Sequence, residues 1–179
     1  IYWDGVDGTL MDSNFINNSA TNDGGAVYWK GINGNVIDSN FINNSASWGG
    51  AVYWKSINGT LSNSTFTCNS ANNHGGGVYW YDNKGTIKDS NFISNIASWG
   101  GGVYWNGVNG TIKYSIFINN SANIHGGGVY WEAAASNCSL INSTFINNFA
   151  NACGGAVYWL GSNGTLSNSI FTSNSVATN

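Results

Sequence analysis

The sequence contains no proline and no arginine, and only 7% of its 179 residues are charged. A chain without proline can donate a backbone N–H almost everywhere, which suits a continuous ladder of paired strands. Five lysines against eight acidic residues give a net charge of −3. Nucleic-acid binding needs a basic face, so this composition argues against a nucleic-acid partner. There is also no apolar run of membrane-spanning length, so no membrane insertion is expected in this segment.

What the sequence does contain is a repeat. The word Gly-Gly-Ala-Val-Tyr-Trp, or its Gly-Gly-Gly variant, begins at residues 24, 49, 75, 100, 126 and 154. Successive tryptophans of this word lie 25, 26 or 28 residues apart. A fixed period in this range is typical of a solenoid, in which each repeat buries its apolar face only against its neighbours. We therefore expect residues 1–179 to form a single segment of seven rungs of about 25–26 residues, cut from a longer repeat array.

Each repeat carries three short strand signals separated by turn residues. The first is Ala-Val-Tyr-Trp, the second follows Asn-Gly-Thr, and the third surrounds a phenylalanine. Helical periodicity is missing. The pattern predicts an all-β parallel β-helix with three short strands per rung, each pairing with its copy in the next rung. One repeat is two residues longer, and we expect its extra residues, within 132–136, to form a bulged loop.

Stacking of rungs places equivalent residues in columns. Phenylalanine, valine and leucine or isoleucine columns are expected to fill the core, and tryptophan shares the inward face of the first strand with valine. An asparagine follows each of these phenylalanines by three residues. Its side-chain amide can form hydrogen bonds with the equivalent asparagines of the two neighbouring rungs, and asparagine also tolerates the left-handed backbone of a turn. This Asn ladder comprises Asn18, Asn44, Asn69, Asn95, Asn120, Asn148 and Asn174.

The opposite face of the first strand carries a column of tyrosines, which we expect to point outward. After Tyr2, this Tyr column comprises the candidate site residues Tyr28, Tyr53, Tyr79, Tyr104, Tyr130 and Tyr158. Two interpretations remain open. The rings could simply stabilise the sheet by cross-strand packing. They could instead form a flat aromatic strip that stacks on glycans or contacts another rod laterally.

The repeated words Gly-Gly-Ala-Val and Phe-x-x-Asn resemble the paired motifs of the chlamydial polymorphic outer-membrane proteins. The wider phrase, Asn-Gly-Thr followed by Asn-Ser-x-Phe-x-x-Asn-Ser-Ala, resembles the adhesin-like surface proteins of methanogenic archaea. The resemblance covers the whole chain, because every rung carries Phe-x-x-Asn and six rungs carry the Gly-Gly word. It implies a right-handed parallel β-helix, extracellular display at the cell surface, and adhesion to glycans or proteins of host or neighbouring cells.

Some parallel β-helices cleave polysaccharides, so the acidic residues were considered as catalysts. Asp12 and Asp38 would be neighbours in adjacent rungs and could form a carboxylate pair. Their surroundings contain no arginine or histidine, and Asp at a turn position needs no catalytic explanation. His74 and His125 would lie two rungs apart, too far to share a metal ion. We therefore expect no catalytic residue, no metal and no cofactor.

The two histidines belong to a further column, placed at the corner just before the glycine pair. This corner column reads Asp23, Trp48, His74, Trp99, His125 and Cys153, and we expect its histidine and tryptophan rings to alternate at an exposed corner. Cys68, Cys138 and Cys153 fall in different columns and are expected to be free thiols. Among the Asn-x-Ser/Thr sequons, the best glycosylation acceptors lie in Asn-Gly-Thr turns, at Asn58, Asn109 and Asn163.

Three functions remain open from the sequence. The first is a non-catalytic surface adhesin, in which this segment is a stalk or a ligand-binding part. The second is a structural subunit of an extracellular fibre or sheath, formed by rods that associate end to end or laterally. The third and weakest is a polysaccharide-active enzyme using the two carboxylates.

Overall fold

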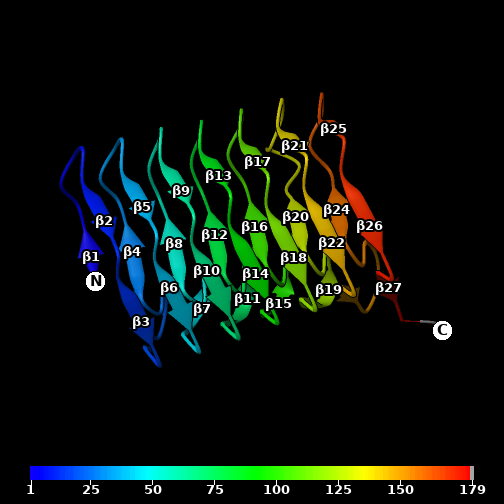
Figure 1. The fold of residues 1–179 in the computed structure, drawn as a ribbon, viewed down its shortest axis with the longest axis horizontal. Coiled ribbons are helices and arrows are strands. Elements are labelled where there is room, and N and C mark those ends of the chain that lie inside the picture. The colour runs from blue at the N-terminus through cyan, green and yellow to red at the C-terminus, as the bar shows by residue number, and fades with distance from the viewer. Residues whose placement is uncertain (178–179) are drawn as a thin grey trace.

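A computed structural model describes residues 1–177, which wind into a rod of stacked rungs (Figure 1). All the paired strands are parallel and short, and no helix occurs among the described residues. Each strand pairs with its copy in the neighbouring rung, so the sheets run along the rod. The predicted all-β parallel solenoid of about seven rungs is confirmed.

Three sheets contain one strand from every rung. Sheet A comprises β1 (Tyr2–Trp3), β4 (Val27–Trp29), β8 (Val52–Trp54), β12 (Val78–Trp80), β16 (Val103–Trp105), β20 (Val129–Trp131) and β24 (Val157–Trp159). Sheet B comprises β2 (Thr9–Met11), β5 (Asn35–Ile37), β9 (Thr60–Ser62), β13 (Thr86–Lys88), β17 (Thr111–Lys113), β21 (Ser139–Ile141) and β25 (Thr165–Ser167). Sheet C comprises β3 (Asn14–Ile16), β6 (Asn40–Ile42), β10 (Thr65–Thr67), β14 (Asn91–Ile93), β18 (Ile116–Ile118), β22 (Thr144–Ile146) and β26 (Ile170–Thr172).

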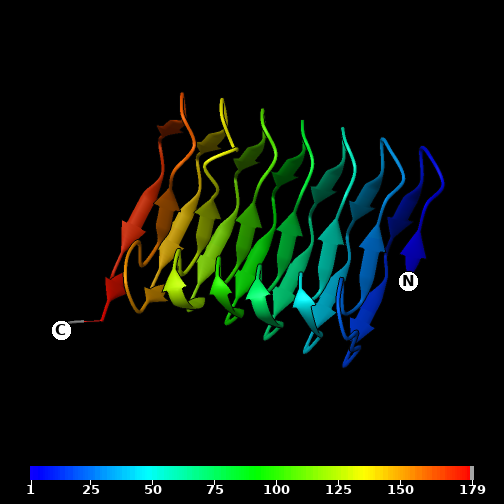
Figure 2. The ribbon, with the colours of Figure 1, turned by 180° about the vertical axis from the view of Figure 1, so that it is seen from behind.

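A fourth sheet adds to the three predicted strands per rung. Sheet D comprises β7 (Ser45–Trp48), β11 (Ser70–His74), β15 (Ile96–Trp99), β19 (Ser121–His125), β23 (Phe149–Ala150) and β27 (Ser175–Val176). Seen from behind, its strands run along the lower edge of the rod, next to sheet A (Figure 2). The sequence gives little sign of this sheet, because serine, alanine and asparagine have weak strand propensity and are held here by the neighbouring rungs.

The core confirms the predicted columns. Phe66 pairs in register with Phe41 and Phe92, and the phenylalanine rings stack with centroids 4.6–5.0 Å apart. Valine and tryptophan of sheet A both face inward, and Trp54 and Trp80 expose no surface. The rod is therefore filled by stacks of like side chains, as a solenoid core requires.

A glycine beneath each indole makes the tryptophan stack possible. A Cβ on Gly85 would come within 2.1 Å of the Trp80 ring, and a Cβ on Gly34, Gly59 or Gly110 would come within 2.1–2.4 Å of the indole of its own rung. Where Cys138 takes the glycine's place, the Trp131 ring is tilted 38° from Trp105, whereas earlier pairs deviate by 1–9°. A side chain at this position therefore displaces the ring above it.

The corners of the rungs correct one detail of the Asn ladder. The ladder residues do not adopt the left-handed backbone. The residue before each one does, with φ of 54–57°, and these residues are Asn17, Asn43, Cys68, Ser94, Asn119, Asn147 and Ser173. The physical reason is that the turn has to be completed before the ladder side chain, so that the amide points inward along the rod.

Candidate functional site

The Asn ladder is a buried structural element. The Asn95 amide donates to Asn120 Oδ1 at 3.0 Å and to the backbone oxygen of Phe66 at 2.9 Å. Its own Oδ1 accepts from both the side-chain and the backbone nitrogen of Asn69, each at 3.0 Å. Asn95 has no exposed surface. The predicted ladder is confirmed, and its burial means that its role is to join rungs rather than to meet a ligand.

The Tyr column lies on the opposite face of sheet A from valine and tryptophan, as expected, but most of it is covered. Tyr53, Tyr79, Tyr104 and Tyr130 are only 3–8% exposed. From Tyr2 to Tyr104 the neighbouring rings meet edge to face, at 78–88° and 4.9–5.3 Å. The rings therefore form an interlocked layer instead of a flat strip, the geometry expected of cross-strand packing. Their role as ligand or lateral contacts stays a prediction.

The corner column covers the Tyr column. Its residues pair in register from rung to rung, so the predicted column is confirmed. The His74 ring lies 4.4 Å from Tyr104, and the His125 ring lies 4.4 Å from Tyr158. Burial lowers the pKa of His74, whose Nδ1 is buried without a hydrogen-bond partner. The sequence pattern identified both columns, but only the fold shows that one packs on the other.

The inserted loop interacts with the same layer. The hydroxyl of Tyr104 donates to the carboxylate of Glu132, which stands at the start of the extra residues. Burial, together with this hydrogen bond, raises the pKa of Tyr104 above its usual range. Burial and the nearby Glu132 charge also raise the pKa of Tyr130, to about 12. The loop therefore places a carboxylate against the Tyr column at its fifth member.

An exposed hollow lies beside this layer, at the corner between sheets D and A in the first three rungs. A groove of about 370 Å³ is lined by Asn22, Asp23, Ser47, Trp48 and Asn73. Trp48 is 40% exposed. Burial raises the pKa of Asp23, and the charge of Lys55 partly opposes this effect. An exposed indole among amide, hydroxyl and carboxylate groups makes this groove the candidate binding site.

The other predicted residues remain apart from this groove. Asp12 and Asp38 sit at exposed corners with φ of 50° and 49°, a backbone that Asp and Asn adopt readily. Within residues 1–177, no three His, Cys, Asp or Glu side chains are close enough to bind one metal ion. No helix among those residues is long and apolar enough to span a membrane.

The three cysteines are unpaired, with Cys138 buried and the other two exposed. The three favoured sequon residues, Asn58, Asn109 and Asn163, are exposed at the corner between sheets A and B. Their φ values of 54–57° turn each chain tip outward. Glycosylation of these residues stays a prediction.

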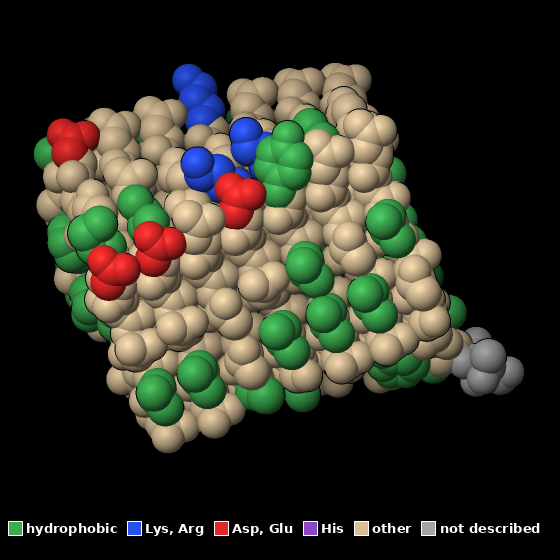
Figure 3. All heavy atoms as spheres, viewed as in Figure 1, with side chains coloured by type: hydrophobic (Ala, Val, Ile, Leu, Met, Phe, Trp, Pro, Cys, Tyr) green, Lys and Arg blue, Asp and Glu red, His purple; other side chains and the backbone are tan. Residues whose placement is uncertain are grey.

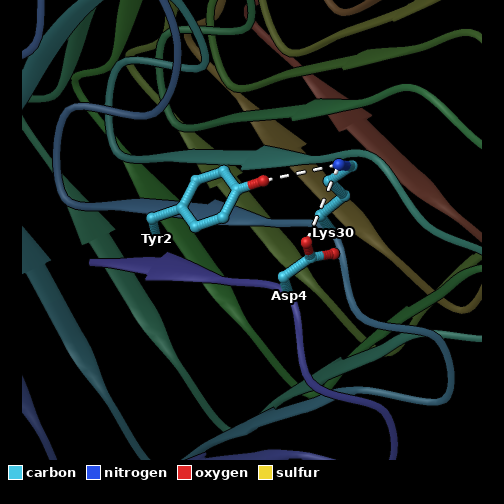
Figure 4. Close-up of polar contacts among 3 residues, drawn as sticks. All are labelled: Tyr2, Asp4 and Lys30. Atoms are coloured by element: carbon cyan, nitrogen blue, oxygen red, sulfur yellow. Dashed lines mark hydrogen bonds and ion pairs between the residues drawn. The ribbon is translucent and has the colours of Figure 1, made fainter.

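Charge contributes little to the cohesion of the rungs. Among the described residues one ion pair is present, between Lys30 and Asp4 at 3.8 Å, and the same Nζ lies 3.4 Å from the Tyr2 hydroxyl (Figure 4). Both charged side chains are about half exposed, so water screens the pair. On the face formed by sheets B and C, hydrophobic side chains are separated by polar ones (Figure 3). That face is therefore a mixed surface without a continuous apolar patch.

The fold and the surface define a class, the repeat-built parallel β-solenoid with a structural interior and a variable exterior. Within this class, the family model for the Chlamydia polymorphic membrane protein repeat matches residues 12–28, 38–53 and 142–158. Each match runs from a left-handed corner through sheet C and the Asn ladder to the tyrosine of sheet A. Three segments of the chain thus match the chlamydial repeat that its motifs resemble. No significant match to the chain was found among curated proteins or among solved structures.

Proposed function

We propose that this protein is a non-catalytic, adhesin-like β-helix of the cell surface, and that this segment is a stalk or ligand-binding part mediating attachment to cells or glycans. The observation that supports it most is the threefold match to a repeat named for membrane proteins. The name of that family favours an extracellular position at a cell surface.

The division between the interior and the exterior of the rod supports the same proposal. The matched segments supply the phenylalanine stack, the Asn ladder and the glycine corner, which are all structural. Some outward positions differ from rung to rung, and the corner column has Asp, Trp, His and Cys in equivalent places. A constant scaffold with variable outward residues suits recognition by a surface.

The non-catalytic part of the proposal rests on the surroundings of the acids. Asp12 and Asp38 occupy turn positions whose backbone explains an Asp or Asn. Both carboxylates are exposed outside the groove, and among the described residues neither has an ion-pair partner. Turnover of polysaccharides that is lost in Asp12→Asn or Asp38→Asn would overturn this part.

Attachment can be tested with fluorescent beads coated with the folded protein and added to bacterial and epithelial cells. We expect more beads to bind than with an unrelated β-solenoid of the same net charge. Treatment of the cells with glycosidases or with protease then separates glycan receptors from protein receptors. Equal binding of both bead types would contradict an adhesive role.

A fibre subunit is the second candidate, formed by rods that associate laterally through exposed apolar side chains such as Ile16, Ile96 and Tyr114. Light scattering on a rod with polar caps at both ends distinguishes the two roles, since lateral fibre assembly predicts concentration-dependent growth and a stalk predicts monomers.

A further inference from the structure

The two tryptophans of the corner column occupy equivalent positions but have different surroundings. Trp99 lies between two histidines, and its ring stacks on His74 at 5.0 Å with an 18° angle. Trp48 meets His74 edge-on, at 6.0 Å and 70°, and its neighbour on the other side is the short side chain of Asp23. No ring of the preceding rung covers Trp48, which explains why its indole is exposed beside the groove.

The polar groups around this indole are arranged for hydrogen bonding. Ser47 donates its hydroxyl to the backbone oxygen of Thr21 at 2.7 Å, which leaves the oxygen lone pairs free to accept. Asn22 and Asn73 line the groove from the rungs on either side of Ser47 and Trp48, and Asp23 adds a carboxylate. The groove thus offers donors and acceptors next to an apolar ring, and no lysine lines it.

A second hollow extends this groove over the outer face of sheet D. It holds about 320 Å³ and shares Ser47 with the first. Its lining is rich in hydroxyl and amide groups, and comprises Ser19, Ala20, Thr21, Ser45, Ala46, Ser47, Ser70 and Asn72. The exposed indole therefore stands at one end of a longer polar track.

We propose that this corner groove binds a neutral glycan, with one pyranose ring on Trp48 and its hydroxyl groups hydrogen-bonded to Asn22, Asp23 and Asn73. A pyranose combines a face of C–H groups, which an indole accepts, with a rim of hydroxyl groups, which amides and carboxylates bind. The next sugar residues lie along the hydroxyl-rich face of sheet D. The inference rests on the proposed adhesive function and specifies its ligand.

The charge of the groove selects against acidic sugars. Asp23 contributes a carboxylate, and the lining residues include no cation that would compensate a sialic acid or a sulfate. Lys55 influences Asp23 by its charge, but its Nζ lies 5.5 Å from the Tyr81 ring and it does not line the groove. Neutral oligosaccharides should therefore bind in preference to anionic ones.

The test is isothermal titration of the whole chain with neutral chito-, cello- and mannotetraose and with anionic sialyllactose. We expect at least one neutral probe to bind, and Trp48→Ala to weaken it at least tenfold. Tyr114→Asn is the matched control, because it removes a 54% exposed aromatic ring from a corner where asparagine is common. Asp23→Asn should keep neutral binding and reduce the discrimination against sialyllactose. Circular dichroism checks that each variant is folded, since Trp48 lies outside the core.

Several results would overturn the proposal: no binding of any neutral probe, equal binding by Trp48→Ala, an equal loss in Tyr114→Asn, or a preference for sialyllactose. The bead assay separates this failure from failure of the adhesive function. If Trp48→Ala leaves bead attachment unchanged, the adhesive function stands and glycan binding in the groove does not explain it. If the protein binds a glycan through Trp48 but its beads do not attach to cells, the groove is a glycan site and the adhesive function is wrong.

Discussion

The tryptophan stack and the Tyr column come from adjacent residues of the same strands but pack in different ways. Inside, the first five tryptophan rings lie parallel within 1–9° because a glycine leaves a flat slot beneath each indole. Outside, the first five tyrosines meet at 78–88°, and the corner column covers several of them. Ring geometry therefore follows from the neighbouring small residues and covering groups, and not from the rung spacing alone.

Both columns change at the same rung. Trp131 tilts by 38° where Cys138 replaces the glycine, and Tyr104 and Tyr130 become parallel, at 6°, where Glu132 binds the Tyr104 hydroxyl. These changes fall in the repeat that contains the two extra residues. A solenoid tolerates an insertion at a corner, but the rings on both faces of the adjoining strand adjust to it.

The largest loss of unfolding free energy should come from Asn95→Ala, which interrupts the buried Asn ladder. The substitution leaves the Asn69 backbone N–H, one Asn69 side-chain N–H and the Phe66 carbonyl without these partners in a buried site, whereas Asn120 Oδ1 keeps the Asn95 backbone N–H. Each buried polar group left unpaired costs about 1–3 kcal/mol, so we expect about 3–5 kcal/mol less unfolding free energy. Urea unfolding followed by tryptophan fluorescence measures it. Asn91→Ala, on the outer side of sheet C, is the control and should change little; equal losses would contradict a special role of the ladder.

A smaller effect should follow from filling a slot under the tryptophan stack. Gly85→Ala places a methyl group against the Trp80 ring and should cost about 1–3 kcal/mol, the usual range for overpacking. The reverse change, Cys138→Gly, should let the Trp131 ring return to a parallel stack. Urea unfolding gives the stability of both variants, and near-ultraviolet circular dichroism reports the ring geometry. A Gly85→Ala protein that is more stable than the wild type would contradict the claim that the Trp80 indole leaves no room for a side chain at this position.

The outer face should respond to alkaline pH. The pKa values of Tyr53, Tyr79, Tyr104 and Tyr130 are raised by burial, and Tyr130 reaches about 12. The stability that these tyrosines contribute is complete below about pH 10, which is the tyrosine pKa in the unfolded chain. It is lost as the pH rises through the raised pKa values of the folded protein. Unfolding free energy should therefore fall between pH 10 and 12, and less steeply in Tyr104→Phe. Tyrosines that all titrate near pH 10 by absorbance at 295 nm would contradict the burial.

The smallest effect should come from the histidine that covers the Tyr column. Burial lowers the pKa of His74, so its contribution is present above about pH 6.5 and is lost as pH falls and the unfolded chain takes up the proton. The melting temperature should drop from pH 7.5 to 5.5, and less so in His74→Gln. If the melting temperature falls equally in the wild-type protein and in His74→Gln, groups other than His74 cause the acid sensitivity.

Most of the interior was predictable from the sequence because each core column repeats one residue type. Phe66 and Asn69 recur at fixed spacing in every rung, and that spacing alone sets the register and the ladder. The inward face of sheet A was predictable from Val78, because valine is a typical core residue and Trp80, two residues later in the strand, points to the same face. Regular stacking makes one correct rung sufficient to place the others.

The exterior was less predictable because it depends on contacts between columns. Alternation showed that Tyr79 points outward, but it could not show that His74 and Trp48 lie against it. Sheet D was not predicted because serine, alanine and asparagine, which make up most of its strands, have weak strand propensity. The groove at Trp48 depends on one short side chain, Asp23, in the preceding rung, which no period could indicate.

The Asn ladder also gives the rod a direction. Each ladder residue from Asn18 to Asn148 donates its backbone N–H and one side-chain N–H to the ladder oxygen of the rung that follows. The ladder oxygen itself faces the preceding rung, beside a second amide N–H that bonds a phenylalanine carbonyl there. Two rods meeting by like faces would not reproduce these bonds. Any joint that continues the ladder must be head to tail, and so must the growth of such an array by duplication of rungs.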